Sequence, residues 1–158
     1  MSDEAATAVL RRRLDQSKEY YLSGETRPLS FRKRQLQRLS EAIRLREEAI
    51  LEALAADLGK CEFESFTSEI ALLYDEIKFV RRRLGRWARP RRVSTPLVHF
   101  PSSSHVIPEP LGVALILSPW NYPFMLAVAP LIGAIAAGCT AILKPSEHAP
   151  ATSAVLRE

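Results

Sequence analysis

Apolar residues recur at helical spacing over three stretches in the first 90 residues, and each stretch predicts an amphipathic helix. The helices are expected over residues 4–22, 30–58 and 64–87, with Ser23-Gly24 ending the first and Ser30 as the N-cap of the second. The apolar stripes comprise Leu10, Leu14 and Tyr21 in the first helix, Leu36, Leu39, Ile43, Ile50 and Leu54 in the second, and Phe66, Ile70, Leu73, Ile77, Leu84 and Trp87 in the third.

The run Leu111–Leu117 is apolar at successive positions and lies between two prolines, which predicts a strand that ends in a turn. Such a strand is expected to be covered on both faces, as parallel strands of α/β proteins are. A helix over residues 124–137, with Pro123 in its first turn, and a second strand over residues 140–143 complete a βαβ unit. Both strands then end at one sheet edge, and another helix is expected to begin at Pro150.

The region between the helices and the strands is rich first in arginine and then in proline and serine. Seven arginines lie between Arg81 and Arg92, and such a cluster suits a nucleic acid or an anionic membrane surface. Leu84 and Trp87 are interleaved with them, which favours a helix that buries its apolar stripe and solvates its arginines, with no nucleic acid partner. Residues 93–110 are expected to be extended, as a surface connector or as edge strands.

Composition favours a folded domain, because 47% of the 158 residues are hydrophobic and 25% are charged, with a net charge of +4. Residues 111–143 carry no charge and are numerous enough to cross a membrane, but prolines and glycines punctuate them and favour strand, helix and strand. A small membrane-associated or non-catalytic interaction protein stays open as the alternative, as does peripheral membrane association. No secretory signal is visible, and the two cysteines, Cys61 and Cys139, favour the reducing cytoplasm.

Several uncommon short sequence motifs occur in a fixed order, and together they are more specific than a single glycine motif. They are PWNYPF at residues 119–124, GAIAAG at 133–138 and KPSE at 144–147, and with them the chain strongly resembles the NAD(P)-dependent aldehyde dehydrogenases. The words SGETRPL at 23–29, AADLGK at 55–60 and SEI at 68–70 resemble the class-three branch, whose members oxidise fatty, aromatic or coniferyl-type aldehydes. The resemblance covers almost the whole chain.

The resemblance implies an α/β fold in which amino-terminal helices pack on the start of a parallel Rossmann-like sheet, as part of an NAD(P)-binding domain. Residues 1–92 would form the outer helices, residues 93–110 would extend toward an oligomerisation sheet, and residues 111–158 would form the first βαβ unit. The implied reaction is oxidation of an aldehyde to a carboxylic acid with NAD or NADP, through a cysteine thiohemiacetal and thioester. The full-length enzyme is expected to be a homodimer.

The resemblance also assigns roles to six residues at the two strand ends. Asn121 would donate its side-chain amide to the oxyanion, and Lys144 and Glu147 would bind the hydroxyls of the adenosine ribose. Ser118, Pro119 and Trp120 would line the dinucleotide cleft, and Asn121 would also be among the cofactor-binding residues. A carboxylate at Glu147 would repel a 2′-phosphate, which favours NAD over NADP. From the residues alone, Asn121 could instead cap a helix, and the lysine and glutamate could be solvated charges.

The nucleophilic cysteine and the general-base glutamate of the resembled family belong to sequence beyond Glu158, so this chain is expected to be inactive alone. Cys139 follows a glycine at a helix end, where a small buried residue fits, and neither it nor Cys61 is expected to be the nucleophile. The three histidines have no metal-ligand spacing, and no metal site is expected; they are His99, His105 and His148.

Overall fold

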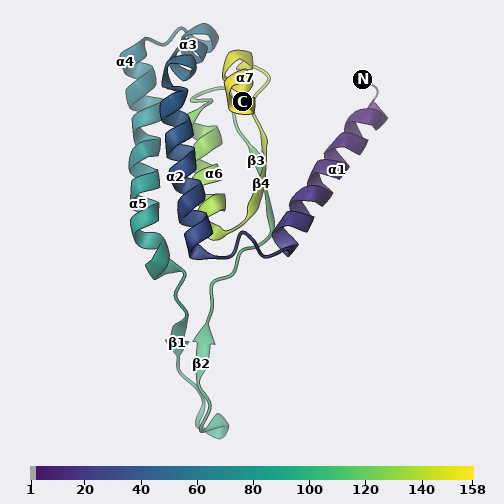
Figure 1. Cartoon of the computed structure of the whole chain (residues 1–158), viewed down its shortest axis with the longest axis vertical. Helices are drawn as coiled ribbons and strands as arrows, with labels where there is room; N and C mark the ends of the chain where they lie inside the picture. Colours follow the sequence, from purple (N-terminus) through teal and green to yellow (C-terminus); the bar gives the residue numbers. More distant parts are fainter. Residues whose placement is uncertain (1–2) are drawn as a thin grey trace.

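The computed structural model describes residues 3–158 and consists of a layer of helices packed on a small parallel sheet. Figure 1 shows α2 (Leu29–Leu45), α5 (Ala71–Trp87) and α6 (Met125–Ala137) side by side, and all three contact one another. The sheet, β3 (Val113–Leu117) and β4 (Thr140–Lys144), packs against α6. The α/β fold with amino-terminal helices on the start of a parallel sheet is therefore confirmed.

The helix expected over residues 30–58 is in fact two helices, α2 and α3 (Glu47–Leu58). Arg46 leaves the helical conformation, with φ −112° and ψ 12°. The interruption is a single residue, because the Arg46 N–H still bonds to the Ala42 carbonyl at 3.1 Å and the Ile50 N–H to the Arg46 carbonyl at 2.9 Å. Ser30 is not the N-cap as expected, since α2 begins at Leu29 and no side chain caps it.

The helix expected over residues 64–87 contains a π-helical turn. It consists of α4 (Glu62–Ser65), the π-helix η1 (Phe66–Ile70) and α5. The wider turn inserts a residue into the helical ladder. Glu69 and Ile70 are consecutive, yet both side chains are fully buried. A carboxylate therefore enters the core at this turn.

The expected apolar stripes of the second and third helices meet in one core, which α6 completes. Leu39 and Phe66 lie at its margin, and Trp87 is 45% exposed. The stripe of α1 (Asp3–Leu22) is not buried in this way, because Leu10 is 61% exposed. The buried core residues are Leu36, Ile43, Ile50, Leu54, Ile70, Leu73, Ile77, Val80, Leu84, Phe124, Val128, Ile132 and Ala136.

The expected βαβ unit is confirmed, since β3 and β4 pair in parallel from Val113↔Thr140 to Leu117↔Lys144. The helix between them ends at Gly138, whose φ of +89° suits glycine, and a Cβ there would lie 2.7 Å from the Arg32 Nε. Pro123 is not in the first turn as expected, because α6 begins at Met125.

The expectation that β3 is covered on both faces is wrong for the described residues. Ile116 is 7% exposed, whereas Leu115 and Leu117 are 64% and 68% exposed. These leucines alternate with Ile116 and so lie on the opposite face of the strand. Within residues 3–158 the parallel sheet has only two strands, and one face of β3 stays largely uncovered.

A hairpin projects from the helices and the sheet (Figure 1). It pairs β1 (Arg91–Val93) with β2 (Ser104–Val106) in antiparallel register and carries a 3-10 turn, η2 (Leu97–His99), near its tip. Residues 93–110 thus contain the end of β1, the turn η2 and the strand β2. No helix of the described residues is both long enough and apolar enough to span a membrane.

A carboxylate from α3 fixes the start of α7 (Pro150–Arg157), the helix expected at Pro150. Asp57 accepts hydrogen bonds from the N–H groups of Ala151 at 3.0 Å and Thr152 at 2.7 Å. These are among the first N–H groups of a helix, which have no acceptor within the helix itself. Asp57 therefore ties α7 to the helical layer.

Asp57→Ala is expected to lower the free energy of unfolding by about 1–2 kcal/mol, because two N–H groups lose their acceptor. Urea unfolding followed by circular dichroism measures this. Glu52→Ala is the matched control: it removes an exposed carboxylate from the same helix and should change the free energy by less than about 0.5 kcal/mol. Equal stability of Asp57→Ala and the unaltered chain would contradict the capping role.

Candidate functional site

The two parallel strands end side by side, and this edge carries the candidate residues. Leu117 pairs with Lys144 at the end of the ladder, and the next N–H, that of Ser118, donates to the Lys144 carbonyl at 3.2 Å. Ligands of parallel α/β sheets bind beyond the carboxyl ends of the strands. The structure therefore places Ser118 and Lys144 together at the edge where a ligand is expected.

The turn after β3 presents one pair of residues to solvent and buries the next pair. Trp120 is 55% exposed and Asn121 is exposed, whereas Pro123 and Phe124 are buried. Tyr122, between the two pairs, has a φ of +50°, a conformation that side-chain-bearing residues rarely adopt. Surrounding contacts must hold a residue in such a conformation. The exposed amide of Asn121 thus lies on a turn whose later residues, Pro123 and Phe124, are buried.

Glu69 supplies one of these anchors. Its Oε2 accepts hydrogen bonds from the N–H groups of Phe124 at 2.9 Å and Met125 at 3.3 Å, where α6 begins. Its Oε1 accepts from the Lys60 Nζ at 2.5 Å. The Lys60 Nζ also lies 4.1 Å from the centre of the Tyr122 ring, a cation–π contact. The buried carboxylate and its ammonium partner together hold the Asn121 turn from behind.

Sequence reasoning did not assign Lys60 and Glu69 to the site. Both lie in motifs on which the resemblance is based, AADLGK at 55–60 and SEI at 68–70. A further signal was available, because Glu69 directly precedes a core isoleucine in an otherwise amphipathic helix. Its partner N–H groups are 55 and 56 residues away, so the sequence does not reveal what it bonds to.

Lys144 and Glu147 form an ion pair at the end of β4, with 2.5 Å between Nζ and Oε2. Both side chains are exposed, at 56% and 70%. The pKa of Glu147 is lowered below its ordinary value, chiefly by the hydrogen bond from Lys144, then by a backbone hydrogen bond and the charge of Lys144. The paired ammonium keeps two further protons with which to bind an acceptor.

Ser118 adds a free hydroxyl to the same edge. Its side chain is buried, and its Oγ has no hydrogen-bond partner among the described residues. Buried hydroxyls usually find a partner, and among the described residues Ser65 and Thr152 also carry a buried hydroxyl without one. Ser118, Lys144 and Glu147 together offer a hydroxyl, an ammonium and a carboxylate, a set that suits the hydroxyls of a ribose.

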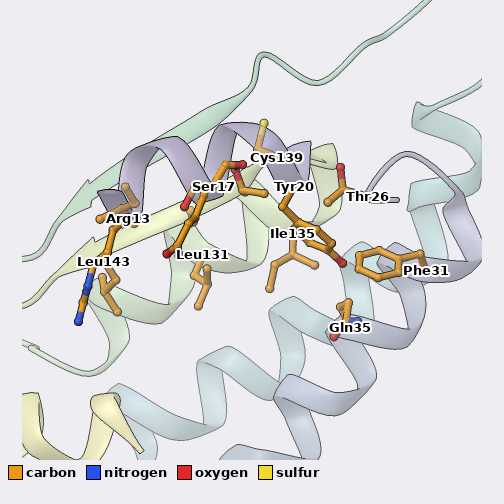
Figure 2. A pocket seen from close by; sticks show the side chains of 14 residues that line it. Arg13, Ser17, Tyr20, Thr26, Phe31, Gln35, Leu131, Ile135, Cys139 and Leu143 are labelled. Carbon is orange, nitrogen blue, oxygen red and sulfur yellow. The ribbon is translucent and has the colours of Figure 1, made fainter. Parts of the chain in front are cut away.

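A cavity lies elsewhere, away from the end of the two strands. It measures about 640 Å³ and opens between α1 and the layer formed by α2, α6 and β4 (Figure 2). Tyr20 and Phe31 line it, as do Leu131 and Ile135, but none of the six expected site residues does. Cys139 lies at its wall, where Figure 2 shows it close to the end of α6. No group of three potential ligands for a metal occurs within residues 3–158.

The model of the aldehyde dehydrogenase family matches residues 3–158. The chain belongs to the aldehyde dehydrogenase family. The resemblance of the sequence motifs to the aldehyde dehydrogenases is therefore confirmed. The match to the family extends over every residue that the structure describes. The candidate edge is thus part of an aldehyde dehydrogenase fold.

Curated relatives place the chain among family members of the class-three type. It is 45% identical over 149 residues to 4,4'-diaponeurosporen-aldehyde dehydrogenase of Staphylococcus aureus, covering 94% of this chain and 32% of the relative. It is 45% identical over 157 residues to aldehyde dehydrogenase family 3 member H1 of Arabidopsis thaliana, covering 98% and 31%. The chain thus spans about a third of the length of these relatives.

Solved structures of the family share the fold. The substrate-bound state of Staphylococcus aureus AldH superposes with a TM-score of 0.90 at 46% identity, covering 93% of this chain and 32% of that one. Aldehyde dehydrogenase C of Pseudomonas syringae, solved as a mutant with NAD+ and octanal, gives a TM-score of 0.79 at 25% identity, covering 94% and 29%. The helical layer, hairpin and βαβ unit described above therefore form a part of the family fold.

Lys144→Met is expected to raise the pKa of Glu147 toward its ordinary value, because the carboxyl loses its main hydrogen bond. A carboxyl with a depressed pKa adds stability above its unfolded-state pKa, and this stability is lost as the pH falls through the folded-state pKa. Titration of the Glu147 side-chain carbon by NMR measures the change. Lys18→Met, on exposed α1, is the control and should leave it unaltered. An unchanged pKa in Lys144→Met would contradict the pairing.

Proposed function

We propose that this chain supplies the oxyanion donor and part of the nucleotide-binding edge of an enzyme that oxidises aldehydes to carboxylic acids with NAD(P)+. The observation that carries the proposal is the register of β3 and β4, in which Leu117 pairs with Lys144. Through it the turn with Asn121 and the pair Lys144–Glu147 leave the same edge of one sheet. Membership of the aldehyde dehydrogenase family gives the reaction class.

Asn121 is proposed to stabilise the charge that develops on the aldehyde oxygen. Attack of a thiolate on the carbonyl carbon moves an electron pair onto that oxygen, and a side-chain N–H can donate to it. An amide suits this role because it donates without titrating at neutral pH. The exposure of Asn121 and the buried residues directly behind it support a donor that is accessible and held in place.

Ser118, Lys144 and Glu147 are proposed to hold the adenosine ribose of the cofactor, with Pro119 and Trp120 beside it. When bound, NAD(P)+ would supply the acceptor for the hydride. The orphan Oγ of Ser118 and the remaining protons of the Lys144 ammonium support this assignment. The carboxylate of Glu147 disfavours a 2′-phosphate, so we propose NAD as the preferred cofactor.

The substrate is proposed to be an apolar aldehyde, fatty, aromatic or coniferyl-type. The names of the Staphylococcus aureus relative and of the octanal-bound Pseudomonas syringae enzyme support this class. We further propose a cytoplasmic enzyme whose full-length form is a homodimer. The projecting β1–β2 hairpin, with Leu97 91% exposed, supports a role in subunit contact.

Asn121→Ala is expected to lower kcat by about 10²–10³-fold, because one oxyanion donor is lost. The test uses a chimera in which residues 3–158 replace the matching part of the Staphylococcus aureus 4,4'-diaponeurosporen-aldehyde dehydrogenase, and it follows NADH formation with an apolar aldehyde. The KM for NAD+ should change little.

Gln16→Ala, which truncates an exposed amide on α1, is the matched control and should retain the kcat of the chimera. The isolated 158-residue chain serves as the blank and is expected to form no NADH. Equal kcat values for Asn121→Ala and Gln16→Ala would overturn the assignment of Asn121.

A further inference from the structure

We propose that Glu69 is a positioning residue for the reaction: through Lys60 and the start of α6, it fixes the turn that aims the amide of Asn121. The inference rests on the proposed function, because it gives Asn121 the role of oxyanion donor. Glu69 itself is fully buried and takes no part as a donor or acceptor to substrate.

The first step of the argument concerns the short chain between Asn121 and the atoms that Glu69 holds. Only Tyr122 and Pro123 separate Asn121 from Phe124, whose N–H donates to the Glu69 Oε2 at 2.9 Å. The ring of Pro123 restricts its φ, and its side chain is fully buried. Freedom in the turn is therefore concentrated in the backbone angles of Asn121 and Tyr122.

The second step concerns Tyr122, whose φ of +50° needs support from its surroundings. Lys60 provides it, because the Nζ lies 4.1 Å from the centre of the Tyr122 ring and 2.5 Å from the Glu69 Oε1. The Lys60 side chain is only 12% exposed, whereas Tyr122 is 41% exposed. One carboxylate thus holds the turn at both ends, by Lys60 at Tyr122 and by direct bonds at Phe124 and Met125.

The third step separates positioning from helix capping in general. Asp57 also caps a helix, α7: its Oδ1 accepts from the N–H of Ala151 and its Oδ2 from the N–H of Thr152. The helix that Asp57 caps, α7, does not follow the turn that carries Asn121. Glu69→Gln and Asp57→Asn therefore each replace a capping carboxylate by an amide of nearly the same shape. Only Glu69→Gln is expected to disturb Asn121.

The first experiment uses the 158-residue chain labelled with ¹⁵N in asparagine. Asn121 is the only asparagine in the sequence, so the spectrum holds one backbone peak and one side-chain NH2 pair. In Glu69→Gln these peaks are expected to shift and broaden as the turn samples other conformations. In Asp57→Asn the Asn121 peaks are expected to stay in place, beside one new backbone peak and one new NH2 pair from the asparagine that the substitution introduces at position 57. Lys60→Met, which keeps the bonds at Phe124 and Met125, should shift them less than Glu69→Gln does.

Unmoved Asn121 peaks in a folded Glu69→Gln chain, or equal shifts in Asp57→Asn, would overturn the inference. If Glu69→Gln fails to fold, Lys60→Met decides, because it removes the contact with Tyr122 and the bond to the Glu69 Oε1 but leaves the bonds at Phe124 and Met125. Peaks in Lys60→Met that coincide with those of the unaltered chain would then overturn it.

The second experiment is a double-mutant cycle in the chimeric enzyme. Glu69→Gln is expected to lower kcat by about 10–10²-fold with little change in the KM for NAD+, as misplacement of a reacting group does. In the Asn121→Ala background the same substitution should have no further effect, because its target is gone. A full additional loss in that background would overturn the inference. No effect of Asn121→Ala itself would refute the proposed function and leave the NMR result standing.

Discussion

A carboxylate that is buried away from water must be paired and hydrogen-bonded, and Glu69 meets this requirement by joining three segments of the chain. Lys60 from the loop before α4 pairs with one oxygen, and the start of α6 donates to the other. The π-helical turn brings this carboxylate into the core beside Ile70. This interaction ties the turn after β3 to the helical layer.

A carboxylate from the helical layer caps the helix that follows each of the two strands. Each strand is followed by a turn and then by a helix, α6 after β3 and α7 after β4. The first N–H groups of both helices bond to a carboxylate from the helical layer, Glu69 for α6 and Asp57 for α7. The turns carry Asn121 in the first case and Glu147 in the second. The helical layer therefore does more than cover the sheet, since it sets where the candidate residues lie.

Hydrophobic periodicity predicted the helices, the strands and the crossover, but it could not show where helices are interrupted. The stripe from Leu36 to Leu54 continues across Arg46, because the helical ladder loses only one residue there. The strand ends predicted the edge with Asn121 and Lys144. The roles of Asp57 and Glu69 depend on bonds between residues 55 to 95 positions apart, and no local pattern reveals such bonds.

Hydrogen exchange at the start of α6 tests the central claim most directly. The first N–H groups of a helix have no intrahelical acceptor, so Phe124 and Met125 should exchange slowly only if Glu69 accepts from them. We predict exchange slowed by about 10²-fold or more relative to the unprotected rate. Ser30 and Phe31, in the first turn of α2 where no side chain caps the helix, should exchange much faster. Unprotected exchange at Phe124 and Met125 in the folded chain would contradict the account.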